Sequence, residues 1–462
     1  MKPSLWTAAI LLLAGWVGAA AQSGRASRKG DVDPRIAAAL RQVSAAQVKA
    51  NILKLASFGT RHTLSDASPE AVAAGRGIGA ARAWIKAEFE RYSRACGGCL
   101  EVEFQSFLQQ PEDRVPRPVE IVNVMATLRG TDPENADRIY LVTGHYDSRN
   151  SDPMDSAGDA PGANDDASGT AVSLECARVL SRHRFPATIV FLAVAGEEQG
   201  LLGARHFAGV AKAQGWKIEG VLNNDIVGGN RTPGDTLQDA AIVRVFSEGI
   251  PLAATEAEVR QLRAAGGEND SPSRQLARHI REIARTYLSG PFGPKLIFRR
   301  DRYLRGGDHS AFNQEGFAAV RFTEFREDFN HQHQNPRTEG GTEFGDLPKF
   351  VDFDYVANVA RLNAATLASL ALAPGPPRNV RLRAKQLEND STLVWEAPPG
   401  DFVRGYEVLW RPTTSAEWEN VEAVGNVTQV TLNRSKDNVI FAVRAVSTRG
   451  NRSLPVVPAP ER

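Results

Sequence analysis

Histidine and acidic side chains occupy four places in the chain that adjoin apolar stretches. The stretch RIYLVTGH ends in His145 and is followed by Asp147. Five further carboxylates hold comparable positions: Asp165 and Asp166 in PGANDDASG, Glu197 and Glu198 after ATIVFLAVA, and Asp225 in GVLNNDI. Carboxylates gathered in one partly buried place repel one another, so they must take up protons or share a cation. Carboxylate oxygens combined with imidazole suit zinc, and suit cobalt or manganese less tightly.

Taken one at a time, the same motifs have ordinary structural explanations. NDDASG is a good turn and helix start, because an aspartate beside a helix N-terminus accepts free backbone N–H groups. GEE fits a solvated loop with two charges, and Asp225 fits a hydrogen-bonded residue at the end of a strand. We therefore expect a metal site only if all four places meet in the folded chain.

The apolar stretches around these motifs predict an α/β fold. Period-two or β-branched runs predict strands at LEVEFQSF, EIVNVMATL, RIYLVTGH, ATIVFLAVAG, GVLNNDIVG, KLIFRR and FAAVRF. Helical spacing of apolar residues predicts helices over 33–57, 70–92, 168–183 and 272–287. The alternation favours a mixed, largely parallel sheet sandwiched between helices. Functional groups collect beyond the carboxyl ends of such strands, so the four places would converge on one rim.

The two ends of the chain predict further parts. Residues 1–21 have the features of a signal peptide: Lys2, an apolar run of about 16 residues, and Ala19 to Ala21 as the cleavage site. A membrane-spanning helix needs about 20 apolar residues, so we expect no span after signal removal. The protein is therefore expected to be exported, to a periplasm or out of the cell. Residues 33–372 carry the α/β pattern.

Beyond APGPPRNV the helical spacing disappears and short strands recur. This pattern predicts an all-β sandwich over residues 376–462. Trp395, Tyr406 and the stretch NVIFAVRAVS resemble a fibronectin type III domain, although Phe441 stands where a tyrosine often anchors the later strand. Such a domain is expected to contact a surface or polymer partner, or to act as a spacer, rather than to catalyse a reaction.

Charge, cysteine content and one irregular segment narrow the remaining possibilities. The net charge of +1 provides no bulk field for nucleic acid, so no nucleic-acid partner is expected. Cys96 and Cys99 in CGGC are predicted to form a disulfide in an oxidising compartment, and Cys176 to pack in the core. Residues 229–271 are rich in Gly, Pro and charge, which predicts an irregular surface excursion near the site.

The motifs GHYDS, PGANDDASGT, AGEEQGLLGARHF and NNDIVG, in this order and spacing, resemble the di-zinc exopeptidases of metallopeptidase family 28. That family includes secreted bacterial aminopeptidases and their glutamate carboxypeptidase relatives. The resemblance covers roughly residues 40–372. It implies an α/β sandwich that binds two zinc ions through one shared carboxylate and hydrolyses peptides, with removal of N-terminal residues as the leading activity.

The resemblance also implies roles for particular residues. Its metal ligands would be His145, Asp165 as the bridge, Glu198, Asp225 and a fifth residue, His333. Asp147 would orient the imidazole of His145, and Asp166 would be a structural group beside the helix start. Glu197 would hold the attacking water, accept its proton as general base and pass that proton to the leaving amine. His331 and, less favoured, His309 in GGDHSAF are alternatives for the fifth ligand; Asp308 in that motif is expected near the substrate pocket.

Three other functions fit parts of the sequence. A carboxypeptidase would need a cation for the substrate carboxylate, which Arg299, Arg300, Arg302 or Arg305 could supply. A non-catalytic adhesion or binding protein could use the same fold, but it would be expected to lack the base or a ligand. A one-metal glutaminyl cyclase would depart from the adjacent-acid and bridging pattern that this chain keeps.

Overall fold

The computed structural model describes residues 32–385 and 387–461. The predicted signal peptide at 1–21 lies outside these residues, so export stays a prediction. Within the described part, no helix combines the length and apolar character needed to cross a membrane.

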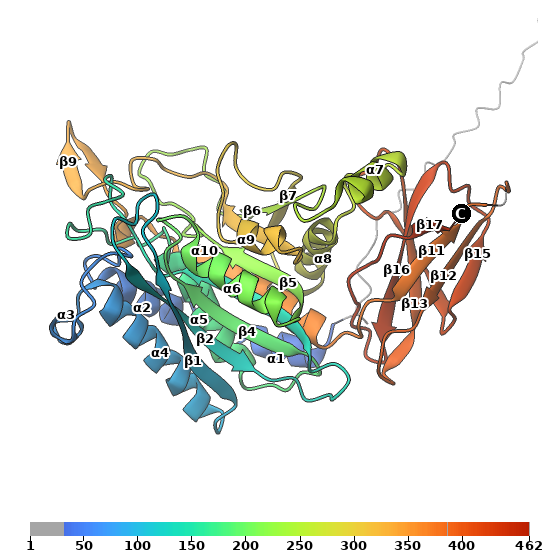
Figure 1. The fold of residues 1–462 in the computed structure, drawn as a ribbon, viewed down its shortest axis with the longest axis horizontal. Coiled ribbons are helices and arrows are strands. Elements are labelled where there is room, and N and C mark those ends of the chain that lie inside the picture. Colours follow the sequence, from blue (N-terminus) through green and yellow to red (C-terminus); the bar gives the residue numbers. More distant parts are fainter. Residues whose placement is uncertain (1–31, 386, 462) are drawn as a thin grey trace, which may run out of the picture.

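An eight-stranded sheet forms the centre of the larger part of the molecule (Figure 1). Its strands are Leu100–Gln109 (β1), Val119–Leu128 (β2), Arg138–His145 (β3), Thr188–Val194 (β4), Lys217–Asn224 (β5), Ile242–Ser247 (β6), Gly293–Ile297 (β7) and Ala319–Glu324 (β8). They lie in the order β1-β2-β4-β3-β5-β8-β6-β7. Strands β4, β3, β5 and β8 are parallel neighbours, whereas β1 and β2, β2 and β4, and β6 and β8 pair antiparallel. The predicted mixed sheet between helices is confirmed.

Helices cover both faces of this sheet. One face carries the larger core, built with Pro34–Leu40 (α1), Ala45–Ala56 (α2), Gly77–Ala95 (α4), Ala167–Leu180 (α5), Pro272–Tyr287 (α8) and Phe353–Ala371 (α10). The opposite face carries Leu202–Ala213 (α6) and His309–Gln314 (α9), whose Phe207 and Phe312 are fully buried. Strands β3 and β4 are buried along their whole length, as expected for central strands covered on both sides.

Two predicted helices are divided in the structure. The segment 33–57 breaks between α1 and α2, because Ser44 is extended and its side chain accepts the N–H of Gln47 as an N-cap. The segment 70–92 divides into Pro69–Ala73 (α3) and α4, which begins at Gly77 with φ of 83°. A Cβ at Gly77 would meet the Asp66 carbonyl oxygen at 2.5 Å. Helix α8 begins and ends as predicted, with Ser271 as its cap.

The predicted irregular excursion over 229–271 is wrong. This segment contains β6, which pairs with both β7 and β8 inside the main sheet, and the helix Glu256–Ala264 (α7). Val243 and Val245 of β6 are fully buried. The strand IVRVFS is short and lies inside a segment rich in Gly, Pro and charge, and the neighbouring strands supply its hydrogen bonds.

The cysteines adopt the predicted states. Cys96 and Cys99 form a disulfide directly after α4, and Cys176 is a buried free cysteine on α5.

The C-terminal part forms two sheets, of order β15-β12-β11-β17 and β14-β13-β16. Their strands are Arg378–Arg383 (β11), Ser391–Glu396 (β12), Val403–Pro412 (β13), Asn420–Gly425 (β14), Gln429–Leu432 (β15), Val439–Ser447 (β16) and Ala459–Glu461 (β17). Trp395, Tyr406 and Phe441 share one core between the sheets. The predicted all-β part is present; its fibronectin type III identity and its surface or polymer partner stay predictions.

This sandwich lies at one end of the molecule beside α7 and α8 (Figure 1). Arg411 of β13 donates to both carboxylate oxygens of Asp270 at 2.9 and 2.7 Å, and Arg278 of α8 donates to the same carboxylate at 2.9 Å. Arg444 of β16, also buried, donates to Glu282 of α8 at 2.6 Å. Buried charges need complete partners, so these ion pairs fix the sandwich against α8 in one position.

Replacing Arg411 should therefore destabilise the whole chain. We expect Arg411→Met to lower the free energy of unfolding by about 3 kcal/mol, because it leaves Asp270 buried with one cation fewer. Urea unfolding followed by circular dichroism measures this change. Arg383→Met is the control: Arg383 forms an exposed pair with Glu461 at 4.0 Å, and its loss should cost less than about 1 kcal/mol. Equal effects of both substitutions would contradict the docking role of Arg411.

Candidate metal centre

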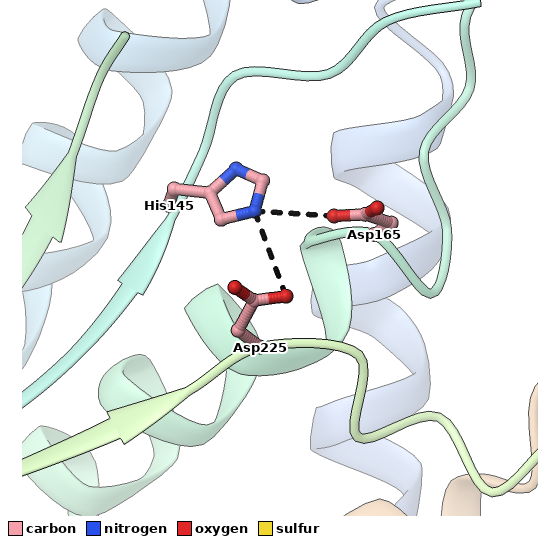
Figure 2. A group of neighbouring side chains, drawn as sticks. All are labelled: His145, Asp165 and Asp225. Carbon is pink, nitrogen blue, oxygen red and sulfur yellow. Dashed lines mark ion pairs between the residues drawn. The ribbon is translucent and has the colours of Figure 1, made fainter. Parts of the chain in front are cut away.

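Three of the predicted ligands meet at the carboxyl ends of the central strands (Figure 2). His145 is the last residue of β3, Asp165 lies in the loop before α5, and Asp225 directly follows β5. The Nε2 atom of His145 lies 3.1 Å from Asp165 Oδ1 and 3.9 Å from Asp225 Oδ1. All three side chains are buried, so an imidazole nitrogen and two carboxylate oxygens face one another inside the protein.

A second group forms on the other oxygen of Asp165. The Nε2 atom of His333 lies 2.9 Å from Asp165 Oδ2 and 2.9 Å from Glu198 Oε1. Asp165 therefore offers Oδ1 to the first group and Oδ2 to the second. This is the arrangement that a carboxylate bridging two metal ions requires.

The parallel strands explain why residues so far apart in sequence converge. His145 at the end of β3 lies opposite Val194 at the end of β4, three residues before Glu197. Helix α5 begins directly against β3, since a Cβ at Gly144 would meet the Gly169 carbonyl carbon at 2.4 Å. Asp166 caps this helix as expected: its carboxylate accepts the N–H of Gly169 at 2.8 Å and that of His145 at 3.0 Å.

Asp147 contacts His145, as predicted, and it also binds the backbone of the two adjacent glutamates. Its carboxylate Oδ1 lies 3.4 Å from Nδ1 of His145, and its main-chain carbonyl oxygen lies 3.2 Å from the same nitrogen. The carboxylate also accepts the backbone N–H groups of Glu197 and Glu198 at 3.3 and 3.2 Å. One buried aspartate thus fixes both the histidine and the adjacent glutamates, as partners of ligand groups commonly do.

The other histidine candidates lie outside the two groups. The ring of His331 stacks on Phe350 with a centroid separation of 3.7 Å. His309 is fully buried, and its Nε2 contacts the carbonyl oxygen of Arg300 at 3.0 Å. Only the folded chain separates these roles, because His331 and His333 are neighbours in one loop.

Two supporting residues carry no recognisable sequence motif. Asp346 accepts the backbone N–H groups of Asn164 and Asp165 at 2.8 and 2.7 Å, which holds the loop of the shared carboxylate. Arg321 of β8 is fully buried and lies 2.7 Å from Asp225 Oδ1. The arginine inside the apolar stretch FAAVRF could have indicated this role from the sequence, since a buried guanidinium needs an anionic partner. No feature of the sequence around Asp346 indicates its role.

The donor set fits zinc. Nε2 of His145 is buried without a well-directed hydrogen bond, although it faces two carboxylates. Burial, together with the charges of Asp225 and Glu198, holds the pKa of Glu197 well above its usual range. Removal of these anions from water is costly without a cation, and two imidazoles with three carboxylates form a ligand set that zinc accepts.

The fold and the site define a mixed α/β protein with a candidate centre for metal ions. Residues 123–339 match the model of peptidase family M28. The chain is 48% identical to a probable zinc metalloprotease of Leptosphaeria maculans, over 93% of this chain and 97% of that protein. It is also 48% identical to a probable zinc metalloprotease of Pyrenophora teres f. teres, over 93% and 87%.

The chain therefore belongs to peptidase family M28. Its fold is similar to that of the Legionella pneumophila LapA aminopeptidase, with a TM-score of 0.51, 18% identity, and coverage of 75% of this chain and 78% of that one. The two relatives named above are fungal, so the predicted kinship with the secreted bacterial type stays a prediction.

Zinc binding to the metal-free protein should release protons. Burial alone would lower the pKa of His333, but Glu198 and Asp165 raise it to about 10. Burial alone would also lower the pKa of His145, but Asp147 and Asp165 raise that pKa well above its usual range. The neighbouring carboxylates thus favour the protonated form of both imidazoles in the metal-free protein, and a metal requires their neutral form. Zinc affinity should rise with pH, by about tenfold per unit for each proton displaced.

Calorimetric titration with zinc, in buffers of different ionisation enthalpy, counts these protons. We expect about two per protein at pH 7, and about one fewer in His333→Ala. His331→Ala is the control and should leave the count unchanged. The reverse result would place the fifth ligand at His331.

Proposed function

We propose that the protein is a two-zinc exopeptidase that removes N-terminal residues from peptides. The observation that carries this proposal is the position of Asp165, whose two oxygens face separate ligand groups 2.9 to 3.1 Å away. Membership of peptidase family M28 supports a peptidase, and relatives named as probable zinc metalloproteases support zinc. Asp165 would bridge the ions, with His145 and Asp225 on one and Glu198 and His333 on the other.

Zinc bound at these groups would polarise the substrate carbonyl and lower the pKa of a water molecule. Glu197 supplies the proton transfer. It lies next to Glu198, belongs to neither ligand group, and is only partly buried. Its backbone N–H is held by Asp147. Its carboxylate can therefore take the proton of the attacking water and deliver it to the leaving amine.

Carboxylates that belong to neither ligand group favour a substrate with a free amine. Asp308 is fully buried and neither of its carboxylate oxygens has a hydrogen-bond partner in the described residues. Together with Glu197 it adds carboxylates beyond those of the ligand groups. A positive α-ammonium group is attracted to such a site, which supports an aminopeptidase.

A carboxypeptidase is the second candidate, and one observation favours it. Arg149 lies at the second ligand group, with Nε 2.9 Å from Glu198 Oε2. The cations expected from the sequence are less available, since Arg302 and Arg305 both pair with Glu327 at 2.8 and 2.7 Å. A guanidinium at the centre could bind a C-terminal carboxylate.

Substitution of the base and of the bridge should have different consequences. Glu197→Gln should keep the zinc content and lower kcat by about 10²–10⁴-fold, because a positioned base contributes that much. Asp165→Asn should lose zinc and activity together, because it serves both groups. Metal analysis with peptide hydrolysis measures both. Full activity of Glu197→Gln would remove its assigned role, and normal zinc content of Asp165→Asn would remove the bridge.

Blocked peptides separate the candidate functions. The zinc-loaded protein should hydrolyse C-amidated tripeptides and leave N-acetylated ones intact, because the acetyl group removes the positive charge that the carboxylates attract. Mass spectrometry identifies the terminus released. Release of C-terminal residues from N-acetylated peptides would establish a carboxypeptidase instead, and binding without hydrolysis of either would support the non-catalytic binding protein.

A further inference from the structure

Two arginines from separate loops reach the second ligand group. Arg149 donates from Nε to Glu198 Oε2 at 2.9 Å, and its Nη2 lies 2.6 Å from Nδ1 of His333. Arg114 donates from Nη1 to the main-chain carbonyl oxygen of Glu198 at 3.2 Å. Both guanidinium groups therefore lie beside the same glutamate.

The chain holds Arg149 firmly in this position. Ser148 and Asn150 on either side are fully buried. The hydroxyl of Ser148 donates to the carbonyl oxygen of Ala160 at 2.7 Å, and the amide of Asn150 donates to Asp155 at 2.7 Å. The side chain of Arg149 remains 16% exposed, against 5% for Glu198. A fixed backbone thus presents a guanidinium that still reaches solvent.

Arg114 is held by the loop between β1 and β2. Glu112 and Val115 pair across this turn, and Val115 is fully buried. Arg114 between them is exposed and has a φ of 59°. A left-handed conformation is uncommon for residues other than glycine, and it is found preferentially at functional sites. Here it brings the arginine onto Glu198.

Arg149 keeps hydrogen-bond donors that could bind a ligand. Its Nη1 has no hydrogen-bond partner within residues 32–385 and 387–461. Nδ1 carries a proton in an imidazole that binds a metal through Nε2, so Nδ1 of His333 accepts no hydrogen bond from Nη2 in that state. The outer edge of the guanidinium would be free, and such an edge binds a carboxylate through two parallel hydrogen bonds.

We propose that Arg149, with Arg114 beside it, forms a carboxylate-binding subsite next to the scissile bond. This inference rests on the proposed peptidase function and names its substrate class: peptides that carry a carboxylate close to the bond cleaved. That group is either the C-terminal carboxylate of a short peptide or an acidic side chain. In both cases the same guanidinium pair recognises it.

Three substrates distinguish the two sources: Leu-Phe, Leu-Phe amide and Leu-Glu amide. Wild-type protein should have a higher kcat/KM for a carboxylate-bearing substrate than for Leu-Phe amide. Preference for Leu-Phe assigns the C-terminal carboxylate, and preference for Leu-Glu amide assigns the side chain. In Arg149→Met this preference should fall by about 10- to 100-fold, the range for a lost hydrogen-bonded charge pair. Arg149→Lys should keep part of it, because the charge remains without the planar edge.

Controls separate recognition from folding. Arg117→Met, in the same loop as Arg114 and also exposed, should leave the preference unchanged, whereas Arg114→Met should reduce it. Zinc content is measured for every variant. If Arg149→Met loses zinc, the substrate preferences of Arg149→Lys and Arg114→Met show whether these arginines recognise the carboxylate. Calorimetry provides a readout without turnover: wild type should bind either phenylalanine or glutamic acid α-amide more tightly than phenylalaninamide, according to which carboxylate is recognised, and Arg149→Lys should narrow the difference.

The subsite would be overturned if the wild type had equal kcat/KM for all three substrates and Arg149→Met lowered the three values equally. Arg149 would then only position Glu198. Failure of the proposed function has a different signature. The wild type would hydrolyse none of the three substrates, yet it would still bind phenylalanine or glutamic acid α-amide more tightly than phenylalaninamide, with a difference that depends on Arg149.

Discussion

The site depends on one constraint: the carboxylate of Asp165 must face two groups of ligands at once. Its oxygens lie 3.1 Å from His145 and 2.9 Å from His333, and these histidines come from the end of β3 and from the loop after β8. The loop that carries Asp165 is held at two points, because Asp346 accepts its backbone N–H groups and Asp166 caps α5 directly after it. The sheet, the helix start and the His333 loop are all arranged around this carboxylate.

The polar groups around the ligands form a second layer that is almost entirely buried. Asp147 accepts the backbone N–H groups of both adjacent glutamates, and Arg321 offsets the charge of Asp225. Such contacts set the orientation of a ligand before a metal arrives, which lowers the reorganisation needed on binding. They also concentrate charge at one rim of the sheet. This rim therefore needs a cation to offset the repulsion between its buried carboxylates.

The C-terminal sandwich takes part in the same architecture. Its ion pairs hold α8, and Arg278 and Arg274 of that helix lie over the ring of Phe298 at 5.5 and 4.1 Å. The chain continues from Phe298 into the loop of Asp301, which lies 3.4 Å from the metal-centre residue Arg321. A module whose sequence suggests a spacer is thus packed against an element that supports the site.

The sequence by itself determined the α/β alternation, the strands that end at or shortly before His145, Glu197 and Asp225, and the motifs of peptidase family M28. These features are local: periodicity and short motifs lie within a few residues of one another. Only the tertiary structure separated His333 from His331 and His309, placed β6 inside the sheet, and brought Arg149 and Asp346 to the centre. Those outcomes depend on contacts between residues far apart in the chain. Loop sequences have no periodic pattern from which such contacts could be predicted.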